Sequence, residues 1–385
     1  MPEELLLQNA RVLLDDFVLR KRDIRIRRGR IAEIGSFPEE KGVDLNGKYL
    51  FPGFVESHFH GACGETFQDI DRKGIEKIAA YEAAHGITTI IPTISGAPEA
   101  VMDSSVEAVG KVMREGNTGG AVIRGLHVEG PFLSVACRGA HREEDLRKPS
   151  IERWNQLQEL SGGCLRSITL APELDGAMEL IRYLNEQGIT VQMGHSAADY
   201  ETTERAVDAG ATVSTHTFNA MVSLHHRAPG ILGAVLTDDR VTCEMIGDLT
   251  HVQGPVLLII YRCKGPDRIT LVSDSMYAAG MPEGTYDLEG RIRTVRGNVA
   301  YLPNGTISGS VCCILDGVRN LVKWGVPLEH AVKAASWNPS RTLRLSDRIG
   351  SIAVGKEADL VVMDDALQVS ATYIGGICVY QEDRA

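Results

Sequence analysis

Several features that would point to a membrane or nucleic-acid-binding protein are missing from the sequence. No apolar run approaches the roughly 20 residues that a membrane-spanning helix needs, and the acidic start, "MPEELLLQNARVLLDD", is not typical of a secretion signal. Lys and Arg (40) are outnumbered by Asp and Glu (51), so the formal net charge is −11. Nucleic acids require a basic face, whereas a small anionic substrate needs only a few local cations. We therefore expect neither a membrane nor a nucleic-acid partner.

Cysteines form no recognisable framework. The chain has eight, of which only Cys312 and Cys313 are adjacent, and it contains no CxxC motif. This scatter is not the spacing of a disulfide scaffold. It predicts free thiols in a reducing compartment, and we expect the protein in the cytoplasm.

The composition is that of a soluble globular enzyme, with 43% hydrophobic and 24% charged residues in 385. Both ends of the chain alternate apolar with polar residues, as in "DIRIRRGRIAEIG" near the N-terminus and "ATYIGGICVY" near the C-terminus. This alternation is typical of antiparallel strands. We predict a small β-sandwich domain built from residues 1–50 and 346–385, which flanks a continuous α/β domain of residues 51–345.

The middle of the chain alternates strands with helices. Three helices are followed by a glycine and then at once by β-branched residues, in "AAHGITT", "NEQGITV" and "DAGATV". Gly86, Gly188 and Gly210 therefore fit left-handed helix caps. The pattern gives eight strands and predicts a parallel (β/α)8 barrel of the TIM type, interrupted by a β-hairpin within residues 287–302.

Two histidines follow two neighbouring strands of this barrel. His195 ends the run Thr190–Met193, His216 follows Ala211–Thr215, and a helical segment lies between them. A strand, a helix and a strand of this length form a parallel βαβ unit, so both imidazoles lie at the carboxyl-terminal face where barrels of this type carry their active sites. The alternative is a pair of unrelated core histidines.

Other polar residues end further strands. His58 and His60 share one face of the first strand, His127 and Glu129 share one face of the third, and Asp274 ends the eighth. Carboxylate with imidazole suits Zn²⁺ or Fe²⁺, and a site with an open position can generate hydroxide near neutral pH. Asp274 is placed to take a proton from that water and pass it to a leaving group. His127 is a candidate for orienting Glu129 rather than for binding metal.

Motifs along nearly the whole chain resemble the amidohydrolase superfamily and, within it, the N-acetylglucosamine-6-phosphate deacetylase family. They include "PGFVESHFHG", "GLHVEGPF", "MGHS", "THTFNAM", "HHRAPG", "LVSDSM" and "GSIAVGKEADLVV". "HVEGPF" together with "HHRAPG" is specific to this deacetylase group. The absence of a lysine at the end of the fourth strand, where "TLAPE" places Glu173, weighs against dihydroorotase or hydantoinase chemistry.

The resemblance implies a function and roles for individual residues. It implies removal of the acetyl group from N-acetyl-D-glucosamine 6-phosphate by metal-bound hydroxide, with D-glucosamine 6-phosphate and acetate as products. Glu129, His195 and His216 would bind the catalytic metal, Asp274 would act as general base and then general acid, and His141 would polarise the acetyl carbonyl. The remaining contacts would be to the sugar phosphate, through Ala140, Asn219, the backbone of Ala220, Arg227, Asp248, His251 and the turn Ile307, Ser308, Gly309.

Several alternatives stay open at the level of sequence. The cofactor is expected to be Zn²⁺, with Fe²⁺ as the second choice, and His58 and His60 would decide between one ion and two per subunit. The substrate could instead be the galactosamine epimer, and the chain could be a scaffold that lacks catalysis. The resemblance also implies a homodimer in which Arg227 and His251 complete the neighbour's phosphate site, while His225 would be a packing residue or lie beside the phosphate.

Overall fold

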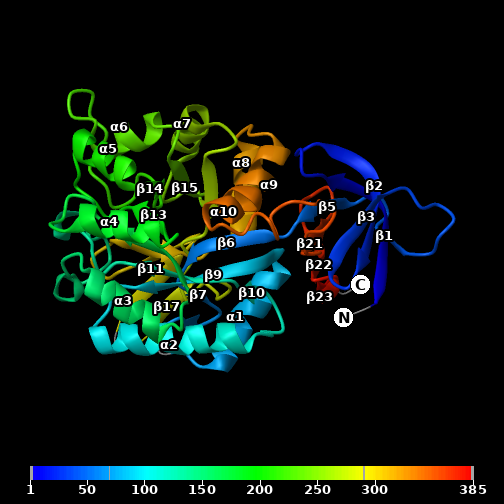
Figure 1. Ribbon diagram of the computed structural model, residues 1–385, viewed down its shortest axis with the longest axis horizontal. Coiled ribbons are helices and arrows are strands. Elements are labelled where there is room, and N and C mark those ends of the chain that lie inside the picture. Colours follow the sequence, from blue (N-terminus) through cyan, green and yellow to red (C-terminus); the bar gives the residue numbers. More distant parts are fainter. Residues whose placement is uncertain (1–2, 69, 289–290, 383–385) are drawn as a thin grey trace.

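The computed structural model describes residues 3–68, 70–288 and 291–382. Figure 1 shows two parts side by side: a barrel surrounded by helices, and a separate sheet that contains both termini. The prediction of a barrel with a β domain assembled from both ends of the chain is confirmed. The exact residue boundaries between the two parts stay a prediction.

The barrel consists of parallel strands that follow one another in sequence order around the ring. Among the described residues, eight strands form its wall: β6 (Phe54–Phe59), β9 (Ile87–Ser95), β11 (Leu126–Glu129), β12 (Leu165–Leu170), β13 (Thr190–Met193), β14 (Ala211–Ser214), β15 (Thr242–Ile246) and β16 (Ile269–Val272). The short β10 (Val122–Ile123) is added beside β9. Between β16 and β6 the ring is linked just beyond the strand end, where Asp274 N donates to His58 O (3.0 Å) and His60 N donates to Ser275 O (2.7 Å).

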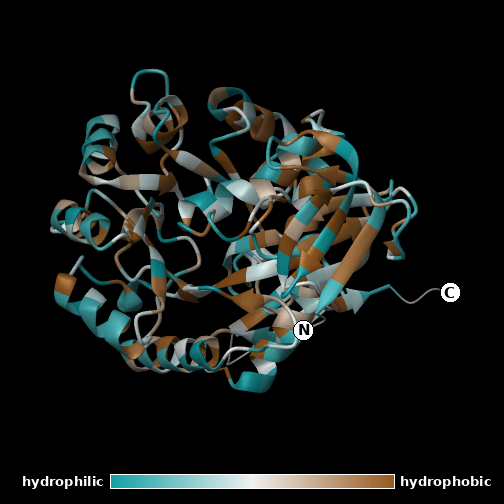
Figure 2. Ribbon diagram, turned by 45° about the vertical axis from the view of Figure 1, so that its right-hand side comes forward, coloured by the Kyte–Doolittle hydropathy of each residue, from teal (hydrophilic) through white to brown (hydrophobic). Residues whose placement is uncertain are grey.

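Burial explains why these strands carry almost continuous apolar runs. Every residue of β6 is buried, because one side faces the barrel interior and the other faces the helices. Figure 2 shows the hydrophobic residues gathered on the inner strands, while the outer helix faces are hydrophilic. The covering helices are α1 (Arg72–Ala84), α2 (Glu99–Glu115), α3 (Ile151–Leu160), α4 (Ala177–Glu186), α5 (Tyr200–Ala209), α6 (Gly230–Thr237), α7 (Gly254–Lys264), α8 (Ile314–Lys323), α9 (Leu328–Ala335) and α10 (Trp337–Thr342).

Local sequence signals determine where several helices begin and end. Asp71, Ser150 and Asp199 each accept a hydrogen bond from a backbone N–H of the first turn of α1, α3 and α5. The three predicted cap glycines have left-handed backbones, with φ of 83° at Gly86, 75° at Gly188 and 118° at Gly210. A side chain would be strained at these positions, so glycine ends the helix and lets the next strand begin.

The terminal strands join in one mixed sheet that curls around its own core. The order is β23 (Ile377–Gln381), β22 (Val369–Ile374), β21 (Leu360–Met363), β5 (Tyr49–Pro52), β1 (Glu4–Leu13), β2 (Leu19–Arg27) and β3 (Arg30–Gly35), and β4 (Val43–Asp44) also pairs with β1. Residue Ile31 of the end strand β3 exchanges backbone hydrogen bonds with Gly355 and Lys356, which lie just before β21. The end strand β3 is therefore joined to the segment that leads into β21, and the sheet encloses a buried apolar cluster that includes Leu7, Ile24 and Leu360.

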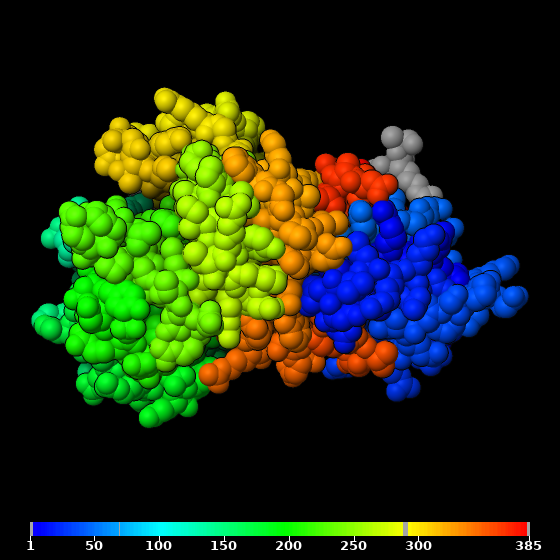
Figure 3. Space-filling model, turned by 90° about the horizontal axis from the view of Figure 1, so that it is seen from above, coloured from blue at the N-terminus to red at the C-terminus, as the bar shows by residue number. Residues whose placement is uncertain are grey.

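A small antiparallel sheet rises from the barrel after β16. It consists of β17 (Gly284–Leu288), β18 (Arg291–Arg296), β19 (Val299–Tyr301) and β20 (Ile307–Ser310). The predicted hairpin is thus part of a larger unit, which stands out from the barrel in Figure 3 as the yellow region. Shorter elements in the loops are β7 (Gly61–Ala62), β8 (Glu65–Thr66), η1 (Val135–Cys137) and η2 (Glu143–Asp145). Within the described part of the chain, no helix combines the length and apolar character needed to cross a membrane.

Candidate active site

A cavity of about 310 Å³ opens at the carboxyl ends of the barrel strands, with the β17–β20 sheet as one wall. Most of the residues predicted for the site line this cavity. They are His60, Glu129, Ala140, His141, His195, His216, Asn219, Ala220, His251, Asp274, Ile307, Ser308 and Gly309. Three predicted residues are not part of the lining: His58, Arg227 and Asp248. The fold therefore brings together residues that are up to 249 positions apart, from His60 to Gly309.

Glu129, His195 and His216 converge on one point. Glu129 Oε1 lies 3.1 Å from His195 Nε2 and 3.0 Å from His216 Nε2, and the two imidazole nitrogens are 3.1 Å apart. His195 Nδ1 lies 3.0 Å from the carbonyl oxygen of Cys137, to which it donates its proton. Its Nε2 then carries a lone pair that faces a carboxylate oxygen. Such a donor set is repulsive alone and requires a cation, so these residues fit a metal ion.

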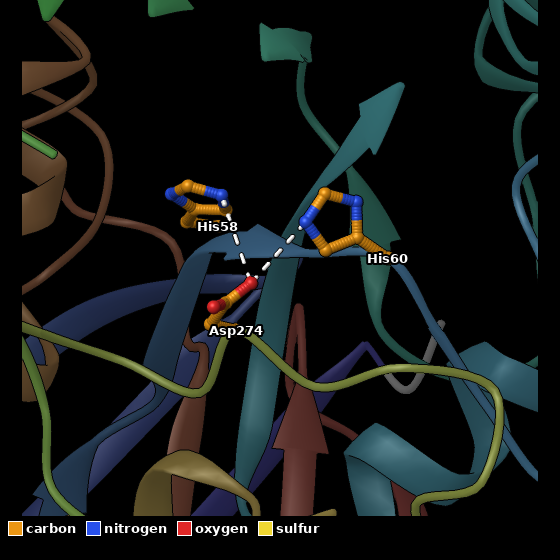
Figure 4. A group of neighbouring side chains, drawn as sticks. All are labelled: His58, His60 and Asp274. Carbon is orange, nitrogen blue, oxygen red and sulfur yellow. Dashed lines mark ion pairs between the residues drawn. The ribbon is translucent and has the colours of Figure 1, made fainter. Parts of the chain in front are cut away.

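A second group of possible metal ligands, His58, His60 and Asp274, lies beside Glu129, His195 and His216. His58 and His60 point from β6 toward the carboxylate of Asp274 (Figure 4), with distances from Asp274 Oδ1 of 3.9 Å to His58 Nε2 and 3.2 Å to His60 Nε2. Glu129 lies between the two groups, 3.4 Å from each of the same Nε2 atoms. His58 Nε2 is fully buried and has no hydrogen-bond partner among the described residues. An orphaned imidazole nitrogen aimed at two carboxylates is further evidence for a cation-binding centre.

His141 approaches the centre from the loop between η1 and η2. Its Nε2 lies 3.3 Å from Glu129 Oε2, and its ring meets the His195 ring edge-on at 4.9 Å between centroids. The ligand atoms of Glu129, His141 and His195 lie close enough together to hold an ion, as do those of His58, His60 and Asp274. His141 also lines the cavity, so its nitrogen is accessible to a bound substrate.

The backbone is strained at three of these positions. His195, His216 and Asp274 have φ of 48°, 26° and 47°, in the left-handed region that residues other than glycine rarely adopt. Each stands two residues beyond the end of a barrel strand, and this conformation turns the chain so that the side chain points across the mouth. Strain of this kind costs about 1–3 kcal/mol per residue and is concentrated at functional sites.

The charges of the centre are strongly coupled. Burial alone would raise the pKa of Glu129, but His58 and the other surrounding imidazoles lower it well below its usual range. Burial also opposes ionisation of Asp274, yet the hydrogen bond to His60 and the nearby His58 bring its pKa to about 2. Burial lowers the pKa of His195 to about 4, so this ring is neutral at physiological pH. Ionised carboxylates beside a neutral imidazole are the protonation states that metal ligands need.

One imidazole of the cavity wall, that of His251, is held by a buried carboxylate. Asp248 accepts a hydrogen bond from His251 Nδ1 at 2.6 Å, and its other oxygen accepts from the backbone N–H groups of Thr250 and His251. Burial lowers the pKa of His251, but the Asp248 carboxylate outweighs this effect and raises the pKa above its ordinary value. Asp248 is thus buried behind His251 and acts on the cavity through it.

Comparison with known proteins decides the family. The chain matches the amidohydrolase family over residues 49–379. It is 38% identical to the N-acetylglucosamine-6-phosphate deacetylase of Homo sapiens over 396 residues, covering 98% of this chain and 96% of that one. The crystal structure of the N-acetyl-D-glucosamine-6-phosphate deacetylase of Mycobacterium smegmatis superposes with a TM-score of 0.91 at 35% identity, over 98% of this chain and 100% of that one.

The chain belongs to the N-acetylglucosamine-6-phosphate deacetylase family of amidohydrolases. The relatives of this chain include deacetylases named for the glucosamine epimer and one named for the galactosamine epimer. The N-acetylgalactosamine-6-phosphate deacetylase of Escherichia coli O157:H7 is 35% identical over 371 residues, covering 96% of this chain and 98% of that one. The level of identity therefore does not distinguish the two sugars.

The geometry of His127 differs from the sequence-based expectation, whereas the expectation that Arg227 reaches a neighbouring subunit's site stays a prediction. His127 forms no hydrogen bond with Glu129 among the described residues, because its nitrogens lie 2.8 Å from Ser167 Oγ and 3.0 Å from Thr169 Oγ1. It belongs to the buried polar interior of the barrel. Arg227 is exposed and lies outside the cavity of its own subunit, with its guanidinium 2.8 Å from His226 Nε2.

Sequence reasoning also missed residues of the deacetylase site. Tyr277 and Arg293 line the cavity, and Arg293 Nε donates to Ser308 Oγ at 2.7 Å. Glu56 and Glu244 are buried beneath the histidines and were not predicted. The signal for Glu56 was its position two residues before His58 on the same strand face, and Glu244 is a charged residue within the apolar run of β15.

Proposed function

We propose that this chain removes the acetyl group from N-acetyl-D-glucosamine 6-phosphate and releases D-glucosamine 6-phosphate and acetate. The observation that carries this proposal is the convergence of Glu129, His195 and His216 on one point, with Asp274 beside them in the same cavity. A mutant of the Mycobacterium smegmatis relative was crystallised in complex with N-acetyl-D-glucosamine-6-phosphate, at 34% identity to this chain, which supports the choice of substrate.

Glu129, His195 and His216 would hold the catalytic cation, as Zn²⁺ or, second, Fe²⁺. Such an ion supplies Lewis acidity that lowers the pKa of a water from about 15.7 to about 7. Asp274, with its pKa of about 2, is ionised at neutral pH and accepts the proton of the attacking water. It then delivers this proton to the amine nitrogen of the sugar, because an amide is a poor leaving group until that nitrogen is protonated.

His141 would donate a hydrogen bond to the acetyl carbonyl oxygen. Its ring lies against Glu129 and His195 and faces the cavity, so it can stabilise the negative charge that grows on this oxygen. His58 and His60, with Asp274 and one oxygen of Glu129, would hold a second ion. Two ions per subunit are favoured over one by the orphaned Nε2 of His58.

The phosphate would bind at the end of the cavity where His251, Asn219 and the backbone of Ala220 lie. The raised pKa of His251 favours an imidazolium that pairs with the phosphate. Arg227 lies on an exposed loop with Leu224, which is 50% exposed, so we propose a homodimer in which this loop reaches the neighbouring subunit's site. Ala140 and the turn Ile307–Gly309 would contact the sugar.

All eight cysteines are free thiols, in keeping with a cytoplasmic enzyme.

The second candidate is N-acetylgalactosamine 6-phosphate, which the relative from Escherichia coli O157:H7 supports. The test measures acetate release from both epimers by the purified protein. It is repeated after chelation and again after Zn²⁺ is restored. We expect the glucosamine epimer to be turned over faster, with activity lost on chelation and regained with metal. Faster turnover of the galactosamine epimer would transfer the assignment to it. Metal-free protein without activity on either would support the scaffold alternative.

A further inference from the structure

A buried carboxylate on β15 contacts both candidate metal groups from below. The Glu244 side chain is 2% exposed, and one of its oxygens, Oε2, serves two donors. His58 Nδ1 lies 3.1 Å from this atom, and the backbone N–H of His216 also donates to it at 3.1 Å. His58 and His216 come from different strands, β6 and the end of β14, and each belongs to one of the two groups. A single carboxylate oxygen therefore connects them.

The contact with His58 determines which nitrogen of the ring can bind a cation. A carboxylate requires a proton from its partner, so Nδ1 carries the hydrogen and donates it to Glu244. The opposite atom, Nε2, is then the nitrogen left to bind a cation, and it lies 3.4 Å from Glu129 Oε1 and 3.9 Å from Asp274 Oδ1. Without Glu244 the proton is free to move to Nε2, and the ring is free to rotate.

The contact with His216 acts on the backbone. His216 has a φ of 26°, a conformation that needs support from its surroundings. The N–H bond to Glu244 anchors the residue at the turn where β14 ends, and Thr217 N also donates to the carbonyl of Glu244 at 2.9 Å. Glu244 thereby holds the direction from which the His216 ring reaches Glu129.

We propose that Glu244 is a positioning residue that prepares His58 and His216 for metal binding and so couples the two ion sites. This inference rests on the proposed function, since it assumes that the two groups bind metal. Glu56 is different, because it accepts hydrogen bonds from the backbone N–H groups of His58 (3.0 Å) and Ser273 (3.1 Å) and, among the described residues, from no imidazole nitrogen. Ligand-orienting carboxylates of the Glu244 type typically change metal affinity by about 10- to 100-fold when they are removed.

The test is metal binding by the full-length protein, stripped with a chelator and titrated with Zn²⁺, with bound metal measured by elemental analysis. We expect Glu244→Ala to bind at least one equivalent about 10- to 100-fold more weakly than wild type. The zinc affinity of Glu244→Gln should lie between those of Glu244→Ala and wild type, because its amide oxygen can still accept both hydrogen bonds. A matched control is Glu82→Gln, a carboxylate on α1 that is 2% exposed and has no hydrogen bond to a histidine among the described residues. It should bind zinc as wild type does.

The variant His58→Asn identifies which of the two zinc equivalents is weakened by Glu244→Ala. The loss caused by Glu244→Ala should be smaller in the His58→Asn background, because one of the two contacts is already absent. If Glu244→Ala does not fold, as judged by circular dichroism of the metal-free protein, Glu244→Gln carries the test alone. Wild-type zinc affinity in every Glu244 variant that folds would overturn the inference while leaving metal-dependent acetate release intact. Wild-type protein that binds neither Zn²⁺ nor Fe²⁺ would overturn the proposed function as well.

Discussion

Buried charge is arranged differently in the terminal sheet and in the barrel mouth. In the terminal sheet, Arg25 is 8% exposed and forms ion pairs with Glu4 and Glu40 at 2.6 Å and with Glu33 at 3.3 Å. In the barrel mouth, no Lys or Arg of the described residues forms an ion pair with Glu129 or Asp274. These carboxylates face imidazole nitrogens instead.

The difference separates structural charge from reactive charge. A guanidinium keeps its proton, so near neutral pH the pairs around Arg25 have one protonation state and stabilise the terminal sheet. Imidazoles and carboxylates exchange protons and bind metals, so the barrel mouth has several states and can move a proton during a reaction. Variants in the two regions should therefore change different properties: those in the barrel mouth should change catalysis, and those at the structural ion pairs should change the free energy of unfolding.

Asp274→Asn should have the largest effect, confined to catalysis. The amide fills the same space but cannot accept a proton at neutral pH, so we expect kcat to fall by roughly 10³-fold, within the range for general acid–base catalysis. Steady-state acetate release measures this, and thermal melting of the metal-free protein checks that the fold is retained. Turnover within a few-fold of wild type would contradict the role of Asp274 and weaken the distinction between the regions.

Arg124→Met should lower the free energy of unfolding and leave kcat nearly unchanged. Arg124 bridges the barrel to the terminal sheet, 2.5 Å from Glu357 and 3.0 Å from Asp359, whose side chains are 14% and 3% exposed. Removing the guanidinium leaves Asp359 buried without a cationic partner among the described residues, whereas Glu357 keeps its ion pair with Arg348 at 2.6 Å. Loss of one partner of a buried ion pair costs about 3–5 kcal/mol. Urea unfolding should report this loss, while kcat of the remaining folded protein stays near wild type.

A surface pair provides the control for Arg124. Arg240 forms ion pairs with Asp208 and Asp238, but its side chain is 55% exposed. Arg240→Met should therefore change the free energy of unfolding by less than about 1 kcal/mol. Equal losses in both variants would mean that burial of the Arg124 pair contributes nothing, contrary to the comparison.

The smallest expected effect concerns substrate affinity and pH. The pKa of His251 is raised by Asp248, so the imidazolium that pairs with the phosphate is present below this pKa and is lost as the pH rises through it. KM should then increase by roughly tenfold across that transition, the usual value of a hydrogen bond to a charged group. In Asp248→Asn burial dominates and lowers the pKa of His251, so the rise in KM should occur at lower pH. His251→Asn should abolish this rise, and a KM of wild type that is independent of pH would contradict the assignment.

Strand periodicity predicted which faces point into the barrel but not how deep each side chain lies. Residues i and i+2 share a face, yet they are separated by about 7 Å along the strand. His58 is consequently fully buried, whereas its neighbour His60 is 19% exposed and lines the cavity. The same offset carries Glu129 to the centre and leaves His127 below it, against Ser167 and Thr169. How deep a side chain lies in the barrel depends on the stagger between adjacent strands, and the sequence of one strand alone does not give this stagger.

Local sequence was enough to predict the alternation of strands and helices, the glycine caps and the polar residues at strand ends, because each of these depends on short-range spacing. Long-range packing was needed to show that Glu129 stands between two groups of imidazoles, that Glu244 contacts both groups, and that Arg227 does not line its own cavity. Those relations join segments far apart in the chain, and they depend on how the ring of strands closes rather than on any local pattern.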